Sequence, residues 1–367
     1  MTTIAARLDE FAAPIARAMP GDGPLGIGLW LPDSAAAELT SDDDVAALGD
    51  WLHQRRLFPF TINGFPFDNF HLPVVKHRVY EPTWADERRL RYTIALANIL
   101  ASLHRQRGSE LATISTLPIG WPSIDDVAVT EAAGRQLREL ATQLHAIERR
   151  TGVRVIVAIE PEPGCMIDTC DDLARFFASH LPDSAHRKYI GVCHDICHSA
   201  VMFEPQRAAL ATYRDAGILV AKVQVSSAIA IRLGELDSAE RAHAMVRLSA
   251  FAEDRYLHQT GCLGHDGSFR LIEDLPLWLA SDEAQRDTEV RVHFHVPIFR
   301  DGDAPLRSTQ DAIIQCVAAM REPEAPDFTG HWEIETYAWT VMPEAMRGGG
   351  LGADIARELD WFRQWLL

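Results

Sequence analysis

The sequence predicts a (β/α)8 barrel, an α/β fold, with an N-terminal helix and long loops after the second and sixth strands. Short β-branched and aromatic runs alternate with longer stretches of helical periodicity, the pattern of parallel strands joined by crossover helices. Several runs are apolar almost throughout, as strands buried on both faces are. The length of 367 residues accommodates a barrel of about 250 residues with insertions.

The eight expected strands cover residues 25–31, 57–63, 111–117, 153–159, 189–194, 218–225, 289–296 and 331–336. The helices between them have ordinary end signals. Gly152 is placed to cap the helix before the fourth strand, Thr169 to start the next helix, and Pro205 to start another.

Two connections exceed the usual length between strand and helix, and either could cover the strand ends as a lid. They are residues 64–84 and 226–288. The second is expected to hold a helix over 238–254, a turn at 264–267 and a helix near 275–284.

We expect residues 1–367 to form one domain, because no tandem repeat, low-complexity tract or Pro/Ser-rich linker divides the chain. Apolar residues recur at helical spacing near both ends. The charged residues near the start favour an amphipathic helix over a signal peptide. The expected parts are an N-terminal helix over 1–22, the barrel over 25–340 and a C-terminal helix over 350–367.

The composition favours a small-molecule partner. The formal net charge of −17 opposes non-specific binding to nucleic acid or anionic membranes. No apolar run reaches transmembrane length. Six cysteines without framework spacing favour a reducing cytoplasm over a disulfide scaffold. The oligomeric state is left open.

Polar residues that end apolar strands are the first candidates for chemistry, because the active site of such a barrel lies at the carboxyl ends of its strands. Glu160 follows five apolar residues, and burying its carboxylate is unfavourable unless a cation or strong donors meet it. Glu162 shares its parity along the chain. Asp195 and His198 form an Asp-x-x-His arrangement where the fifth strand ends, and Asp195 is also placed to cap the following segment.

The sixth and seventh expected strands carry further polar residues. Two-residue alternation puts Lys222 and Gln224 on one face. The Gln224 carbonyl is a hard oxygen ligand that suits Mg²⁺ or Mn²⁺, although a lone buried Gln is more often hydrogen-bonded in the core. His293 and His295 share a face. The pair is compatible with a polar layer, a substrate contact or a metal site.

The eighth strand places Glu333 and Glu335 on one face. Glu335 lies nearer the carboxyl end and is the better ligand, whereas Glu333 is expected to lie deeper and pair with Lys222 or a His. Carboxylates that converge from several strand ends repel one another unless a divalent cation compensates them. The sequence therefore predicts a site for one divalent metal ion formed by Glu160, Asp195, Gln224 and Glu335.

The chain resembles the xylose-isomerase-like TIM barrels, a superfamily of sugar isomerases, keto-sugar epimerases, inosose dehydratase and endonuclease IV. The resemblance spans about residues 25–340 and implies the ligand set Glu160, Asp195 with His198, Gln224 and Glu335. Most of these families have a His ligand on strand six. A Gln at this position, as in Gln224, is more similar to the pattern of inosose dehydratase. More narrowly, NGFPFDNFH, VYEPTW, IEPEPGC, CHDICHSA, KVQVSSA, YLHQT, HFHVP and WEIETYAW resemble the EboE family, the metabolite traffic protein of the ebo gene cluster.

These features favour a metal-dependent isomerase or epimerase that moves a proton next to the carbonyl of a sugar-like or cyclitol-like keto-polyol, through an enediolate. Mn²⁺ or Mg²⁺ is expected before Zn²⁺ or Fe²⁺. The expected catalytic residues are Glu160, Glu162, His198, His295 and Glu335, and the expected substrate contacts are Asn63, His71, Lys76, Lys222 and His293. The alternatives are a dehydratase in which His198 or His295 donates a proton, and a metabolite-binding carrier. DNA cleavage is disfavoured by the acidic charge.

Overall fold

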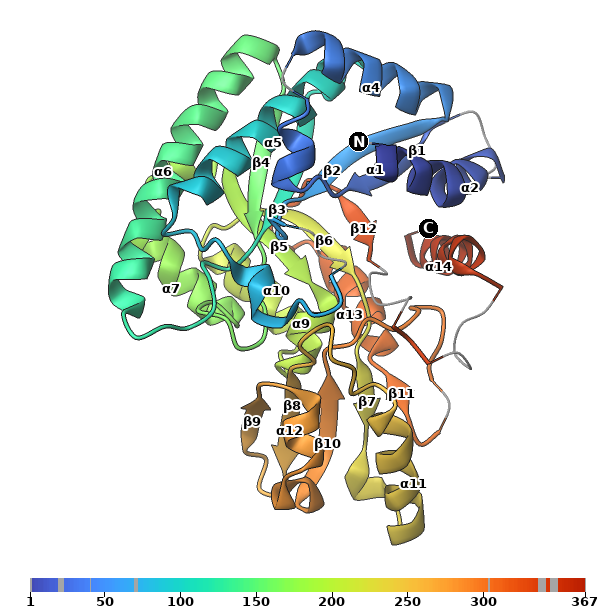
Figure 1. Cartoon of the computed structure of the whole chain (residues 1–367). Coiled ribbons are helices and arrows are strands. Elements are labelled where there is room, and N and C mark those ends of the chain that lie inside the picture. Colours follow the sequence, from blue (N-terminus) through green and yellow to red (C-terminus); the bar gives the residue numbers. More distant parts are fainter. Residues whose placement is uncertain are drawn as a thin grey trace.

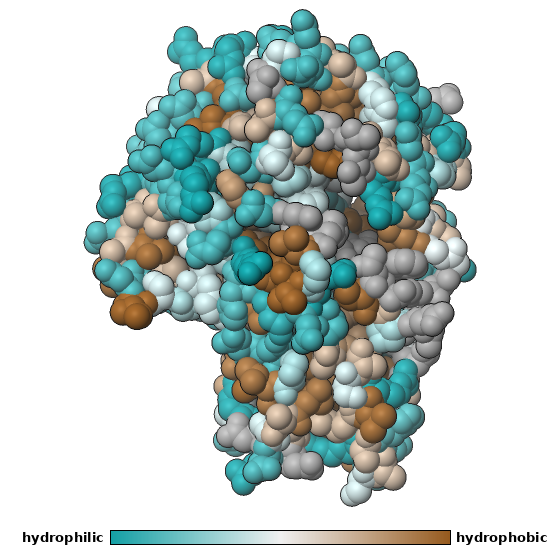
Figure 2. Space-filling model, in the orientation of Figure 1, coloured by the Kyte–Doolittle hydropathy of each residue, from teal (hydrophilic) through white to brown (hydrophobic). Residues whose placement is uncertain are grey.

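The computed structural model describes residues 2–18, 23–39, 41–68, 72–302, 304–335, 341–343 and 349–366. It has the α/β fold class that the sequence predicts. Seven parallel strands curl into a nearly closed barrel with helices around it, and a second, smaller sheet extends from one side (Figure 1). Most of the face in Figure 2 is hydrophilic, and hydrophobic residues gather in patches, one of them near the centre of the view.

The barrel sheet has the strand order β1-β2-β3-β4-β5-β6-β12, and every neighbouring pair is parallel. Its strands are β1 (Leu25–Leu29), β2 (Leu57–Asn63), β3 (Leu111–Thr116), β4 (Arg154–Ile159), β5 (Ile190–Asp195), β6 (Val220–Val225) and β12 (Trp332–Ile334). The two edge strands meet through side chains. A Cβ atom added to Gly28 on β1 would lie 1.4 Å from Glu333 Oε1 on β12, so glycine at this position makes room for the Glu333 carboxylate.

The barrel helices pack on the outside of the sheet. They are α3 (Asp33–Ala36), α4 (Asp42–Gln54), α5 (Glu87–Arg105), α6 (Asp126–Thr151), α7 (Cys170–His180), α8 (Ser184–Arg187), α9 (Ile196–Val201), α10 (Gln206–Asp215) and α13 (Gln310–Met320). The expected end signals are confirmed. Gly152 caps α6 with a left-handed φ of 76°, the Thr169 side chain caps α7, and Pro205 precedes α10.

The terminal segments are helical, as expected. The first comprises α1 (Thr2–Arg7), one turn of π-helix (η1, Leu8–Ala12) and α2 (Ala13–Ala18). The last is α14 (Leu351–Leu366), which packs against α2 and η1 (Figure 1).

The prediction of a seventh barrel strand over residues 289–296 is wrong. Residues Asp287–Val292 form β10, which pairs antiparallel with β7 (Ile229–Ile231) and β8 (Thr260–Gly264) in a separate five-stranded sheet of order β11-β7-β10-β8-β9. The other members are β9 (Phe269–Ile272) and β11 (Arg307–Ser308). The alternation of polar and apolar residues over 289–296 fits a strand in either kind of sheet, and here β10 pairs with strands formed by the preceding insertion.

That insertion is the expected long connection after the sixth strand, and it folds as more than a loop. Besides β7, β8 and β9 it contains η3 (Leu233–Glu235), α11 (Ser238–Ser249), α12 (Leu275–Leu279) and η4 (Asp282–Gln285). The expected helix over 238–254 is present but ends at Ser249, the turn at 264–267 is confirmed, and the helix near 275–284 is split between α12 and η4. The sheet has its own buried apolar cluster around Trp278 and Phe251. The expectation of a single domain stays a prediction.

The second sheet is fixed to the barrel through close backbone packing. A Cβ atom on Gly261 of β8 would lie 2.0 Å from the carbonyl oxygen of Val201, at the end of α9. We expect Gly261→Ala to destabilise the protein by about 1–3 kcal/mol, because neither backbone segment can move without repacking. Urea unfolding measures this effect, with Gly23→Ala as the control, since a Cβ at Gly23 meets nothing within 4 Å. Equal stability of the two variants would contradict the packing.

Candidate active site and metal centre

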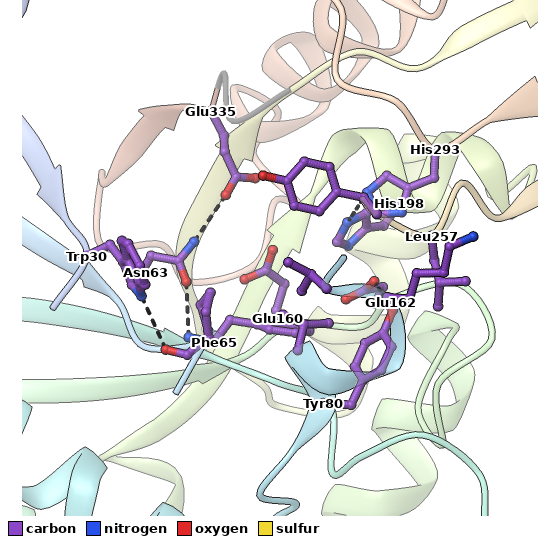
Figure 3. Close-up of a pocket in the computed structure, with 15 residues that line it drawn as sticks. Trp30, Asn63, Phe65, Tyr80, Glu160, Glu162, His198, Leu257, His293 and Glu335 are labelled. Atoms are coloured by element: carbon purple, nitrogen blue, oxygen red, sulfur yellow. Dashed lines mark hydrogen bonds between the residues drawn. The ribbon is translucent and has the colours of Figure 1, made fainter. Parts of the chain in front are cut away.

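A cavity of about 220 Å³ lies at the carboxyl ends of the barrel strands. Glu160 and Glu162, after β4, lie between Trp30 and Phe65 on one side and His198 and His293 on the other (Figure 3). Barrel strand ends therefore supply its carboxylates, as the fold class requires.

Three carboxylates converge beside the cavity, two of which, Glu160 and Glu335, line it. The ligand atoms of Glu160, Asp195 and Glu335 all lie within 4.8 Å of one another. Glu160 follows β4, and its backbone N–H donates to the Thr116 carbonyl at 3.0 Å. Glu335 follows β12 and accepts a hydrogen bond from Asn63 Nδ2 at 3.1 Å (Figure 3). Strand ends that are far apart in the sequence thus bring these residues together.

Asp195 has two roles in this geometry. Its Oδ1 accepts hydrogen bonds from the His198 backbone N–H at 2.9 Å and from Ser226 Oγ at 2.7 Å, so it caps α9. Its Oδ2 lies 3.9 Å from His198 Nε2 and has no hydrogen-bond partner among the described residues. The cap and the metal-ligand interpretations, which the sequence left as alternatives, are therefore compatible.

The buried polar atoms of this cluster fit a cation. Across the described part of the chain, Glu160 Oε2 and both amide atoms of Gln224 also have no hydrogen-bond partner. Gln224 is fully buried and lies opposite Asp195 in the β5–β6 register. Buried acceptors without donors are unfavourable, and carboxylate and amide oxygens are hard ligands for Mg²⁺ or Mn²⁺. Glu160, Asp195 and Glu335 therefore form a group that could hold a metal ion.

The pKa values of the three carboxyl groups also indicate a cation at this cluster. Burial, aided by the charges of Asp195 and Glu162, raises the pKa of Glu160 to about 7, although His198 and Lys222 oppose the shift. Burial and the neighbouring carboxylates also hold the pKa of Glu335 well above its usual range. The pKa of Asp195 is lowered: burial opposes ionisation, but His198, His295 and the two hydrogen bonds outweigh it. Without a cation, Glu335 therefore favours its protonated form at neutral pH, and Glu160 is divided between its two forms.

Glu162 is held by two residues that sequence reasoning did not select. Tyr80 OH donates to Glu162 Oε1 at 2.6 Å, and Gln259 Nε2 donates to the same oxygen at 3.1 Å. Tyr80 belongs to η2 (Lys76–Tyr80) in the first long connection, and Gln259 precedes β8 in the second. Both lie within segments that supported the family resemblance, VYEPTW and YLHQT, but neither ends a strand.

A histidine pair adjoins Glu162. Gln259 Oε1 accepts from His293 Nδ1 at 2.8 Å, and the Pro161 carbonyl accepts from His198 Nδ1 at 2.9 Å. The two Nε2 atoms lie 3.2 Å apart, so one proton must lie between them. Burial opposes charge on His198, but Asp195, Glu162 and Glu160 raise its pKa. Burial and the neighbouring imidazoles hold the pKa of His293 well below its usual range, which places the proton on His198.

The other expected site residues are distributed unevenly. Lys76 lines the cavity and pairs with Asp274 at 2.6 Å. His295 Nδ1 lies 3.5 Å from Glu335 Oε2, and His295 also shares a possible metal-binding group with Cys197 and His293. Lys222 is fully buried, donates to Ser115 Oγ at 3.2 Å and pairs with Glu333, as expected. Lys222 is not among the described residues that line the cavity. His71 lies outside the described residues.

The fold defines the class of protein as a TIM barrel in architecture, with a cluster of carboxylates at its strand ends. No family model and no curated protein sequence matches the chain. Among solved structures, the chain is similar to a xylose isomerase-like TIM barrel protein from Mycobacterium smegmatis in complex with magnesium. The two are 14 % identical, the match covers 99 % of this chain and 87 % of that one, and the TM-score is 0.50. This likeness shows a shared fold.

Two other solved structures match over similar lengths. D-psicose 3-epimerase from Clostridium cellulolyticum H10, with D-tagatose, is 12 % identical over 99 % of this chain and 93 % of that one, with a TM-score of 0.43. The probable 3-DHS dehydratase AsbF from Bacillus anthracis is 12 % identical over 98 % and 93 %, with a TM-score of 0.44. In the described part of this chain, no helix is long and apolar enough to cross a membrane.

Proposed function

We propose that the protein is a divalent-metal-dependent isomerase or epimerase of a sugar-like or cyclitol-like keto-polyol. The observation that carries this proposal is the convergence of Glu160, Asp195 and Glu335 within 4.8 Å beside a cavity. Glu160, Asp195, Gln224 and Glu335 would hold the ion, Mn²⁺ or Mg²⁺ before Zn²⁺ or Fe²⁺. Bound there, the ion would supply positive charge against the negative charge that develops on the substrate oxygens.

The protein's own residues then handle the proton. Glu160 and Glu335 line the cavity and would serve both as ligands and as general bases on opposite faces of the substrate. Glu160 would remove the proton next to the substrate carbonyl, and Glu335 would return one to the opposite face. Glu162 and His198 line the same cavity and would bind the hydroxyl groups. Asn63 holds the Glu335 carboxylate in place.

A dehydratase is the second candidate, because His198 carries the proton of the His198–His293 pair and lines the cavity. An imidazolium there would protonate a departing hydroxyl after Glu160 removes the proton next to the carbonyl, so that water leaves. His295 is the alternative acid. The EboE resemblance supports a small polar metabolite for either reaction, and it is equally compatible with a carrier that binds without turnover.

Incubation in D₂O with ketoses and inososes, both free and carrying an apolar O-alkyl group, tests these functions. The wild-type protein with Mn²⁺ should place one deuterium next to the carbonyl of its substrate, whereas a dehydratase yields a product lighter by one water. Glu335→Gln should reduce exchange by about 100-fold or more, within the range that general acid–base groups contribute. Mass spectrometry and proton NMR measure both outcomes.

The matched control is Glu139→Gln, on the exposed face of α6, which should exchange at the wild-type rate. Tight ligand retention without exchange identifies a carrier. If the metal-loaded protein neither exchanges nor dehydrates any keto-polyol, both enzymatic functions are excluded.

A further inference from the structure

The residues that line the cavity come largely from different parts of the chain according to their chemistry. The carboxylates of Glu160, Glu162 and Glu335 follow barrel strands, and the long insertions add the polar residues Lys76, Tyr80 and Tyr256. The apolar lining residues, which form the apolar wall, come from the two long insertions and from the segment after β1. They are Trp30, Phe65, Pro66, Val75, Val79 and Leu257.

The two insertions are joined to each other above the cavity. The backbone N–H groups of Val75 and Lys76 both donate to the Arg255 carbonyl, at 2.7 and 3.0 Å. Lys76 pairs with Asp274 at 2.6 Å, and His77 pairs with Glu273 at 3.1 Å. The apolar wall is therefore a fixed part of the structure.

The start of the first insertion is also held by a residue of α5. Arg89 on α5 is fully buried and donates to the carbonyls of Gly64 and Phe65 at 3.0 and 2.8 Å, and to that of Pro82 at 2.9 Å. These bonds hold Phe65 at the cavity while satisfying backbone carbonyls that would otherwise be buried without donors.

This wall is unsuited to a ligand that carries a hydroxyl on every carbon. Valine, leucine, proline and phenylalanine side chains neither donate nor accept hydrogen bonds, so hydroxyls pressed against them would lose their water partners without replacement. A single aromatic ring can stack on the apolar face of a sugar. Aliphatic residues from both insertions instead favour an apolar substituent, whose burial is favourable.

The charges at the cavity are mostly negative. Glu160, Glu162 and Glu335 line it and Asp195 belongs to the same group, so one divalent ion and the protonated His198 together offset three of these four charges. Lys76 is the one lysine or arginine among the described residues that line it, and it is paired with Asp274. A phosphate or sulfonate on the ligand would add to this excess of negative charge.

We propose that the ligand is uncharged and amphipathic: a carbonyl- and hydroxyl-bearing head at the carboxylates, and an apolar group against the wall formed by the two insertions. In calling this ligand the substrate, the inference rests on the proposed function. The affinity of the wall for apolar groups does not depend on whether the protein is an enzyme.

A matched pair of fluorescent probes tests the wall. N-phenyl-1-naphthylamine is uncharged, and 1-anilinonaphthalene-8-sulfonate has the same rings with an added sulfonate. The full-length, Mn²⁺-loaded protein should bind the uncharged probe saturably, with about one equivalent per chain, and the sulfonated probe at least tenfold more weakly. Val79→Asp should weaken binding of the uncharged probe at least tenfold, because it places a charge in the wall.

Val79 is only partly buried and lies on η2, so the variant should fold, and Leu257→Gln provides a second variant. Val246→Asp on α11, at a valine that is 70 % exposed, is the control and should bind as the wild type does. No saturable binding, unchanged binding by both wall variants, or equal affinity for the sulfonated probe would overturn the inference. The D₂O experiment fails or succeeds independently of these titrations, so the two proposals fail separately.

Discussion

An Asp195→Asn variant is expected to bind Mn²⁺ about 100-fold or more weakly than the wild-type protein. The change removes one of three converging negative charges, while the remaining Oδ1 still accepts hydrogen bonds from the His198 N–H and from Ser226. The cap of α9 is therefore retained and the effect is electrostatic. Changes to residues that merely support metal ligands already reduce affinity 10- to 100-fold, so loss of a ligand charge should reach at least the upper end. Calorimetric titration measures the affinity.

Stability without metal separates this account from simple misfolding. Because the folded protein lowers the pKa of Asp195, the charge of Asp195 stabilises the fold, and Asp195→Asn should lose some stability in a chelator while still unfolding cooperatively. Added Mn²⁺ should raise the melting temperature of the wild type and leave that of the variant unchanged. Asp171→Asn, an exposed change of the same type on α7, should behave as the wild type does. Equal Mn²⁺ affinity in the Asp195 variant would rule out this residue as a ligand.

Glu333→Gln is expected to destabilise the protein by about 3–5 kcal/mol, because it leaves a buried ammonium group without its counter-charge. Lys222 is fully buried inside the barrel, where it pairs with Glu333 and Ser115. Burial opposes its charged form, yet the Glu333 carboxylate raises the Lys222 pKa above its ordinary value. Urea unfolding followed by circular dichroism measures the loss.

The double variant Lys222→Met/Glu333→Leu should recover most of that stability, because exchange of both partners for apolar side chains leaves no unpaired charge. Surface pairs such as Arg91–Glu87, whose side chains are 66 % and 81 % exposed, provide the comparison. Glu87→Gln should change stability by less than about 1 kcal/mol. If Glu333→Gln changed stability by a similarly small amount, the inference that the buried pair is required for stability would be wrong.

The parts of the fold and site that the sequence could predict follow from local periodicity. Strand parity put Lys222 on the same face as Gln224 and Glu333 on the same face as Glu335, and parallel strands bring their carboxyl ends together. Glu160, Asp195 and Glu335 accordingly lie within one cluster. The deeper position of Glu333 predicted Lys222 or a His as its partner, and the partner is Lys222.

The remaining features depend on contacts that no local pattern specifies. The apolar alternation of residues 289–296 fits a barrel strand, but β10 instead pairs with β7 and β8 of the insertion. His293 still reaches the site, in the segment that follows β10. Tyr80 and Gln259 bind Glu162 from the two insertions, and only the folded chain brings those loops to the strand ends. Sequence periodicity therefore locates the carboxylates better than it locates the residues that hold them.

Anomalous diffraction from a crystal of the wild-type protein soaked in Mn²⁺ tests the central claim most directly. The account predicts one strong manganese peak coordinated by Glu160, Asp195 and Glu335, with the Gln224 amide oxygen among its ligands. A peak at the Cys197, His293 and His295 group instead, or fully occupied sites elsewhere with none at the carboxylates, would contradict it.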